Sequence, residues 1–230
     1  MQCAPTMTDM LNAVERGESM ELQHLISRGA QVAWVDDYGS TALHCACFQS
    51  KTECARVLID AHSPLEVADQ DGTPLHSACF FNSMDCVQLL IAAGAAVNFQ
   101  NPHDGQTPLH RACINGHASI AKMLVDAGSD MSILYRKRTA IEWARERGKT
   151  NCVEVLEEEE RLQWQRKVAA SEAAARELLE EEAPKKKKPG KLKKKVKKRG
   201  GSDVGGSSTL SAGEPGVELR HDEAPAGADA

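Results

Sequence analysis

One seven-residue motif recurs at a nearly constant interval and constrains the fold more than any other feature of this chain. Full copies begin at Thr41, Thr73 and Thr107; each reads Thr, then Ala or Pro, then Leu-His, and each ends in Ala-Cys. A weaker copy begins at Thr139, so that the successive intervals are 32, 34 and 32 residues. A period of this length is typical of a stacked repeat array, in which each unit packs only on its neighbours.

Each full copy carries the signals that begin and end two short helices. Thr73 can serve as an N-cap, and Pro74 then occupies the first helical position, where its missing N–H costs nothing. A second helix is predicted over residues 84–93, where apolar residues are spaced as one buried stripe, and Gly94 can end it in the left-handed conformation. His62 takes the place of that glycine one repeat earlier. The sequence therefore predicts one helix pair in each repeat.

These residues resemble the ankyrin repeat: an Asp- and Gly-containing turn, Thr-Pro-Leu-His, a small paired residue, then Leu-Leu and Gly-Ala. The resemblance implies an all-α solenoid of stacked helix pairs with hairpin loops. The last copy departs from the pattern, with Thr-Ala-Ile-Glu and with Arg138 in the place of the turn glycine, and it is therefore predicted to be a cap. We expect an ankyrin repeat domain over residues 1–160, with repeats near 8–36, 37–68, 69–101, 102–134 and 135–160.

Charge divides the remainder of the chain into three segments. Residues 161–183 are predicted to form a charged helical extension, supported by four-residue charge pairs such as Glu157–Arg161. A solvated extension of the last helix and a coiled coil both stay open, although a steady heptad is absent. The Lys-rich run 184–199 and the acidic low-complexity tail 200–230 are predicted to be disordered.

The repeated histidines and cysteines are candidate metal ligands or nucleophiles, but their periodicity argues against both. Equivalent atoms in neighbouring stacked helices lie about 8–10 Å apart, whereas zinc needs ligands at roughly 2.0–2.3 Å. The cysteines recur at equivalent positions, one of which holds Ile120 in another copy, so they are interpreted as small buried hydrophobes. No phosphate loop or other catalytic signature occurs. The sequence predicts no catalytic residues, no metal, no cofactor and no enzyme activity.

The resemblance implies a non-catalytic adaptor that binds an unidentified protein through its concave face and hairpin tips. Three of the four phenylalanines of the chain lie on the exposed face of the first helices. Phe48 and Phe80 either pack on each other or anchor a partner, whereas Phe81 has polar counterparts in the other repeats, which favours a partner contact. The candidate partner-binding residues are Tyr38, Phe48, Phe80, Phe81, His103, Asp104, Ile114, Asn115, Arg136 and Lys137.

The basic run supports an alternative function, that of a nuclear protein associated with nucleic acid or chromatin. Residues 185–199 contain eleven lysines or arginines and no acidic residue. Such a run is typical of a nuclear localisation signal read by an import receptor, of nonspecific contact with nucleic acid or anionic lipid, or of a solubilising tail. The residues concerned are Lys185, Lys186, Lys187, Lys188, Lys193, Lys194, Lys195, Lys197, Lys198 and Arg199.

The sequence carries three further expectations. Neither a secretory signal nor a membrane span is apparent, so we expect the protein in the cytoplasm and/or nucleus. We also expect a monomer. Asn98 occupies a hairpin position similar to those hydroxylated in ankyrin repeats by an asparaginyl hydroxylase, although asparagine also favours the turn itself.

Overall fold

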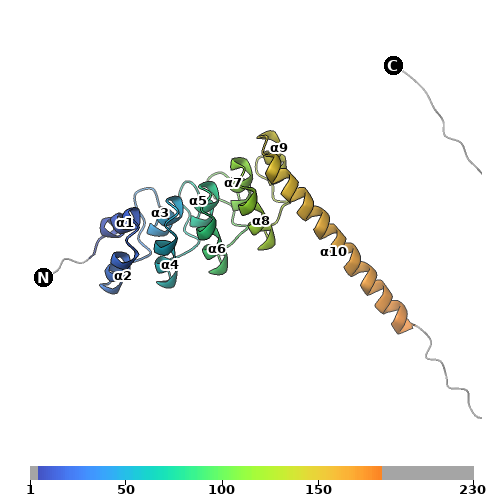
Figure 1. Cartoon of the computed structure of the whole chain (residues 1–230), viewed down its shortest axis with the longest axis horizontal. Coiled ribbons are helices and arrows are strands. Elements are labelled where there is room, and N and C mark those ends of the chain that lie inside the picture. The colour runs from blue at the N-terminus through green and yellow to red at the C-terminus, as the bar shows by residue number, and fades with distance from the viewer. Residues whose placement is uncertain (1–4, 183–230) are drawn as a thin grey trace, which may run out of the picture. The chain divides into compact units, whose positions relative to one another are not determined.

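The computed structural model describes residues 5–182, with side chains up to residue 176, and this part of the chain contains ten helices (Figure 1). The helices come in consecutive pairs, as the repeat motif predicts. Their bounds are α1 Met7–Arg16, α2 Ser19–Ser27, α3 Ala42–Phe48, α4 Thr52–Asp60, α5 Pro74–Phe80, α6 Met84–Ala92, α7 Pro108–Asn115, α8 Ala118–Asp126, α9 Ala140–Glu146 and α10 Thr150–Glu182.

The helix pairs stack into two rows, which confirms the predicted all-α solenoid. In one row α1, α3, α5, α7 and α9 pack successively side by side, and in the other row α2, α4, α6, α8 and the start of α10 do the same (Figure 1). Between repeats, short hairpin turns are closed by isolated bridges such as Val35–Thr41 and Asp69–Gly72. Each repeat therefore buries its apolar face only against the repeats beside it.

A threonine–histidine pair begins α3, α5 and α7, and at α3 and α5 the histidine also joins neighbouring repeats, whereas Nε2 of His110 at α7 is buried without a hydrogen-bond partner among the described residues. The backbone N–H of Thr73 donates to Nδ1 of His76 at 3.1 Å. Because Nδ1 accepts this bond, the ring proton belongs on Nε2, which lies 3.1 Å from the carbonyl oxygen of Gln106 in the next repeat. His44 bonds in the same way to Thr41 and to the carbonyl oxygen of Gly72. The motif histidines are thus scaffold, as the sequence predicts.

The turn ahead of α5 has room only for glycine. Gly72 has φ +110°, and a Cβ atom added there would lie 2.6 Å from the ring of His76. The packing of the histidine against the backbone of its own turn therefore excludes any side chain at this position.

The repeated cysteines are buried in the core, which confirms their interpretation as small hydrophobes. All seven cysteines among the described residues are free thiols, and only Cys45 is more than marginally exposed. Burial raises the pKa of the Cys79 thiol well above its ordinary value, so this thiol does not ionise at neutral pH. In residues 5–176, no cluster of three or more His, Cys, Asp or Glu side chains could hold a metal ion.

α10 begins as the second helix of the last repeat and continues beyond it. Its first turns pack on α8 and α9 through Cys152, Leu156 and Glu159, and buried Glu159 forms an ion pair with Lys122 of α8. From Trp164 to residue 176 every side chain is exposed, as expected of a solvated extension. None of the helices in residues 5–182 combines the length and the apolar character that crossing a membrane requires.

Candidate functional site

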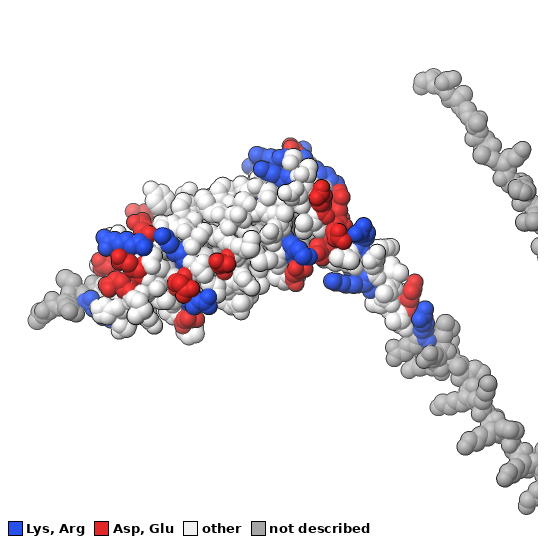
Figure 2. Space-filling model, in the orientation of Figure 1, with Lys and Arg blue, Asp and Glu red and all other residues white. Residues whose placement is uncertain are grey.

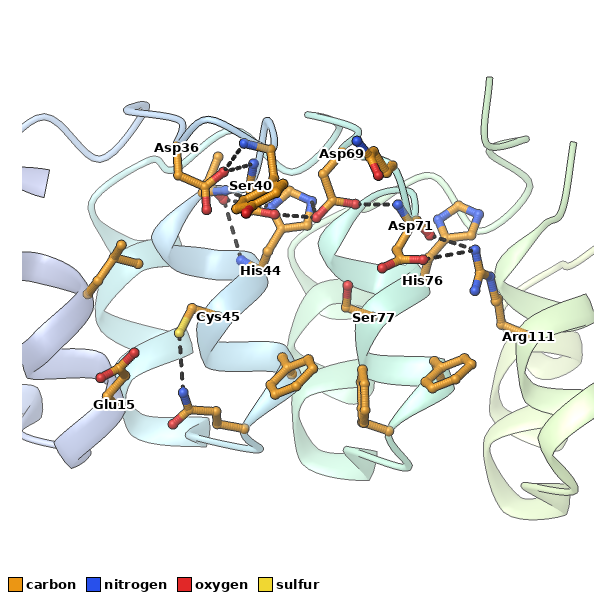
Figure 3. A pocket seen from close by; sticks show the side chains of 18 residues that line it. Glu15, Asp36, Ser40, His44, Cys45, Asp69, Asp71, His76, Ser77 and Arg111 are labelled. Atoms are coloured by element: carbon orange, nitrogen blue, oxygen red, sulfur yellow. Dashed lines mark hydrogen bonds and ion pairs between the residues drawn. The ribbon is translucent and has the colours of Figure 1, made fainter. Parts of the chain in front are cut away.

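A groove of about 480 Å³ runs along the row of first helices, beside the hairpin turns (Figure 3). Residues from α1, α3, α5 and α7 line it, together with the turns that precede α3 and α5. In Figure 3 the three aspartates, the histidines and Arg111 lie toward the turn side, three phenyl rings lie at the opposite edge, and Glu15 lies at the α1 end, away from the turns. The groove therefore has one polar and one apolar wall.

Three phenylalanines make the apolar wall, and Phe81 lies between the other two. Its ring centroid is 4.2 Å from that of Phe48 and 4.7 Å from that of Phe80. The rings are tilted by 57° and 63°, the edge-to-face packing that aromatic pairs prefer. Phe48, Phe80 and Phe81 nevertheless remain 54%, 39% and 41% exposed. The three rings therefore pack against one another and still leave part of each ring exposed to solvent.

Carboxylates of two successive turns make the polar wall, and hydrogen bonds fix them in place. Oδ1 of Asp36 accepts the backbone N–H groups of Tyr38 and Ser40, at 2.9 and 2.8 Å. The hydroxyl of Ser40 donates to Oδ2 of Asp69 in the next turn at 2.5 Å, and Oδ1 of Asp69 accepts the N–H of Asp71 at 2.8 Å. These bonds lock neighbouring turns to each other, so the wall is preformed.

The imidazoles that line the groove add no positive charge at neutral pH. Burial lowers the pKa of His44 below its ordinary value of 6.5, although the nearby Asp69 carboxylate opposes the change. Burial likewise lowers the pKa of His76, to about 4. Both rings are therefore neutral at pH 7, and they do not neutralise the carboxylates beside them.

Arg111 closes the end of the groove that lies toward α7. Its guanidinium lies 3.1 Å from Asp104 and 3.8 Å from Asp71, and it donates to the backbone carbonyl of Asp71 at 3.0 Å. The same group lies 5.7 Å from the ring centroid of Phe80, a cation–π distance. This end of the groove carries its own cation, which also covers part of Phe80.

At the opposite end, Cys45 lies on the floor of the groove between two acidic side chains. Burial raises the pKa of its thiol to about 11, and the negative charges of Glu15 on α1 and Asp36 contribute to this rise. Among the ion pairs of residues 5–176, none involves Glu15 or Asp36. The end near α1 is therefore acidic, and its two carboxylates form no ion pair among these residues, although the positive charge of Lys51 partly opposes their effect on the pKa of Cys45.

The structure brings only part of the predicted surface together. Tyr38, Phe48, Phe80 and Phe81 line the groove, and Tyr38 is 71% exposed at its mouth. The other predicted contact residues lie outside its lining, although Asp104 touches it through Arg111. These others are His103, Asp104, Ile114, Asn115, Arg136 and Lys137.

The hairpin tip before α9 differs from the earlier tips in charge and in backbone. Arg136 and Lys137 are both exposed and both adopt positive φ, of 50° and 66°. The guanidiniums of Arg136 and Arg138 lie over Tyr135 and Trp143, at 5.1 and 5.2 Å from the ring centroids. Figure 2 shows the basic side chains gathered at this end of the array.

The side chain of Asn98 already bonds to the next repeat. Its amide donates to the carbonyl of Gly128 at 3.2 Å, and its oxygen accepts the N–H of Asp130 at 2.8 Å. These bonds join two repeats and are distinct from the turn-forming role expected of this residue, and its hydroxylation stays a prediction. The lysines and the arginine of the run 185–199 lie outside the described residues.

Sequence reasoning missed Glu15, Cys45 and Arg111. Cys45 and Arg111 occupy the position directly after the motif histidine, within a segment that the period assigns to the scaffold. That position holds Ser77 and Trp143 in the other copies, and this variation could have marked it as part of the surface. Glu15 comes from the first repeat, which lacks the motif, so the period does not place it on the groove.

Comparison with known families agrees with the geometry. A family model described as Ankyrin repeats (3 copies) matches the chain over residues 10–101 and again over residues 81–164. The two matches overlap and together extend from α1 into α10. No curated protein shows a significant match to the chain.

Proposed function

The chain belongs to the ankyrin-repeat family, and we propose on that premise that it is a non-catalytic adaptor, which holds a partner protein in the groove of its concave face. The observation that supports the proposal most directly is the open cluster of Phe48, Phe80 and Phe81. Clustered aromatic side chains that remain open to solvent are the usual anchors of protein interfaces.

The area of this cluster is large enough to matter for affinity. Phenylalanine offers roughly 200 Å² of surface, so the exposed fractions of the three rings leave roughly 250 Å² uncovered. At about 25 cal/mol per Å², covering this area contributes roughly 6 kcal/mol before the costs of association. The cluster can therefore supply the hot spot of a moderately tight interface.

The rigidity of the groove lowers the cost of binding. Bonds between repeats hold the polar wall: Ser40 donates to Asp69, and Arg111 donates to the carbonyl of Asp71. Packing of Phe81 on Phe48 and Phe80 orders the apolar wall. A surface that is already ordered loses little conformational freedom when a partner docks. Complementarity of shape and charge on this preformed surface is the proposed mechanism.

A differential capture experiment tests the proposal. Phe48→Ser/Phe81→Ser removes the two rings that Arg111 does not cover, and Met20→Ser/Met84→Ser removes two exposed apolar side chains outside the groove. Affinity capture with the full chain, followed by mass spectrometry, is expected to lose a defined set of proteins with the phenylalanine variant only. An unchanged partner list, from a variant whose thermal melt shows it to be folded, would rule out this surface.

The Lys-rich run supports a second function, nonspecific association with nucleic acid in the nucleus. The eleven positive charges of residues 185–199 would release counterions from phosphates on binding, which makes the affinity strongly dependent on salt. Deleting the run and titrating salt tests this function. Nucleic-acid binding that persists without the run, or that shows no salt slope, would exclude it.

A further inference from the structure

We propose that the groove takes a peptide segment of a partner protein in which an arginine or lysine lies close to a bulky apolar side chain. The inference rests on the proposed function and deepens it, because it assigns the chemistry of the partner. The cation is assigned to the acidic end formed by Glu15 and Asp36, and the apolar side chain to the rings of Phe48 and Phe81.

The charge balance of the groove selects against an acidic partner. Four carboxylates line it, those of Glu15, Asp36, Asp69 and Asp71, against the single guanidinium of Arg111. The histidines that line it are neutral at pH 7 because they are buried. A partner that carries negative charge would meet like charge along most of the polar wall.

The carboxylates are not equally available, and this sets the position of the cation. Both oxygens of Asp69 accept hydrogen bonds within the protein, and Asp71 lies close to Arg111. Glu15 has no cationic partner among residues 5–176, and Asp36 uses only Oδ1 for its turn. The carboxylates without an ion pair therefore lie at the α1 end, where both raise the pKa of the Cys45 thiol and the charge of Lys51 opposes them only in part.

The apolar wall is available beside this acidic end. Cys45 and Phe48 are three residues apart on α3, so they lie on one face of the helix about 5–6 Å apart. Phe81 contacts Phe48 on the side away from α1. Phe80 is about as exposed as Phe81, but it lies beside the Arg111 guanidinium at the α7 end, so Phe48 and Phe81 are the exposed rings without a cation beside them.

These positions give the spacing that a partner must satisfy. A cation over Cys45 and an apolar group over Phe48 are separated by about one helical turn of α3. An extended peptide meets this spacing with residues two positions apart, and a helical peptide with residues three or four positions apart. The groove therefore selects a short basic–apolar pair.

Selection from a random peptide library tests the proposal although the partner protein is unidentified. A phage-displayed library of 12-residue peptides is selected on the immobilised full chain at 50 mM NaCl. Enriched sequences are expected to place Arg or Lys within four positions of Phe, Trp, Leu, Ile or Met. The peptides that enrich most are then synthesised, and their affinities are measured in solution at 50 and 500 mM NaCl.

Two groove variants and one control separate the two walls. Glu15→Gln/Asp36→Asn removes two charges and keeps a side-chain oxygen at position 36 to accept the N–H groups of the turn. This variant is expected to bind the peptides about tenfold more weakly at 50 mM NaCl and to lose most of the salt dependence of binding. Asp60→Asn/Asp85→Asn removes two exposed charges from α4 and α6, outside the groove, and is expected to have no effect. Phe48→Ser/Phe81→Ser is expected to abolish binding.

The outcomes distinguish this inference from the proposed function. Peptides that need Phe48 and Phe81 but bind Glu15→Gln/Asp36→Asn equally well would overturn the inference and leave the adaptor function standing. An enriched set that is acidic but needs Phe48 and Phe81 would likewise overturn only the inference. An enriched set that binds both groove variants unchanged, or no enrichment at all, would overturn both. Self-association of the full chain that the groove variants abolish would assign the groove to a second copy and overturn the assignment to a partner.

Discussion

Acid should destabilise the array through His76, because the fold needs this imidazole in its neutral form. Nδ1 accepts the backbone N–H of Thr73, and Nε2 faces the carbonyl oxygen of Gln106. Protonation would place an N–H on Nδ1 that points at another N–H, inside a site where the ring is fully buried. The charged form is therefore disfavoured both by burial and by the loss of an acceptor.

The size of the effect follows from the pKa of the ring. Burial, assisted by the charge of Arg111, lowers the pKa of His76 from 6.5 to about 4, and the hydrogen bond to the Gln106 carbonyl opposes this change together with Asp104 and Asp69. The unfolded chain binds this proton as the pH falls through 6.5, whereas the folded chain binds it only near pH 4. The contribution to stability is therefore complete above pH 6.5 and is lost on acidification, by about 2 kcal/mol at pH 5 and about 3 kcal/mol below pH 4.

Urea unfolding of the full chain between pH 7.5 and 4.5 measures this loss. His76→Gln is the matched variant, because its amide can reach toward Gln106 but does not titrate. The variant loses the acceptor for the N–H of Thr73 and is expected to be less stable by about 1–3 kcal/mol at pH 7.5. Other titrating groups act in both proteins, so the difference in unfolding free energy isolates His76.

The difference between the two proteins is expected to shrink by about 2 kcal/mol from pH 7.5 to pH 5, which corresponds to a shift of about 1 M in the urea midpoint. An NMR titration of the imidazole nitrogens gives an independent reading and should place the midpoint of His76 near 4. A difference that does not change with pH, or an imidazole that titrates near 6.5, would refute the reasoning.

Three further predictions concern single positions. The Cys45 thiol, with a pKa of about 11, should react with iodoacetamide at pH 8 about a hundredfold more slowly than an ordinary exposed thiol, and Glu15→Gln should speed this reaction. Mass spectrometry measures the rate of alkylation at Cys45 in the two proteins. Equal rates would contradict the acidic environment. His62 ends a repeat at φ 61°, so His62→Gly should raise the free energy of unfolding by about 0.5–1 kcal/mol, whereas the control His62→Ala should not. Lys122→Met should lower the free energy of unfolding because it leaves buried Glu159 without a cation, and adding Glu159→Leu should recover most of that loss in chemical denaturation.

The fold was predictable because each part of the motif has a local physical role. Threonine caps a helix, proline begins it, histidine bonds the turn, and small apolar residues fill the space between helices. Helices α3, α5 and α7 begin at the residue after the motif threonine, as these roles require. Because each repeat contacts only its neighbours, local rules repeated in phase suffice to specify the whole stack.

The groove was only partly predictable, because it is assembled from residues that share no local pattern. Its acidic end joins Glu15 of α1 to Asp36 of the following turn, and its basic end comes from Arg111 of α7. The position after the motif histidine faces the groove, yet it lies inside a segment whose other members are all buried. Only the geometry of the stack shows that this one position of the motif is exposed to a ligand.

The phenylalanine cluster shows why aligned repeats do not reveal such a surface. Alignment by the period compares Phe48 with Phe80 and sets Phe81 against the polar residues of other copies. In the structure Phe48 contacts Phe81 of the next repeat. The two residues occupy different positions of their repeats, so an alignment by the period does not pair them; we call such contacts diagonal. A ligand lying across several repeats meets such diagonal neighbours. The binding specificity of this array should therefore depend on combinations of positions in adjacent repeats, and the variants that test it must change such pairs together.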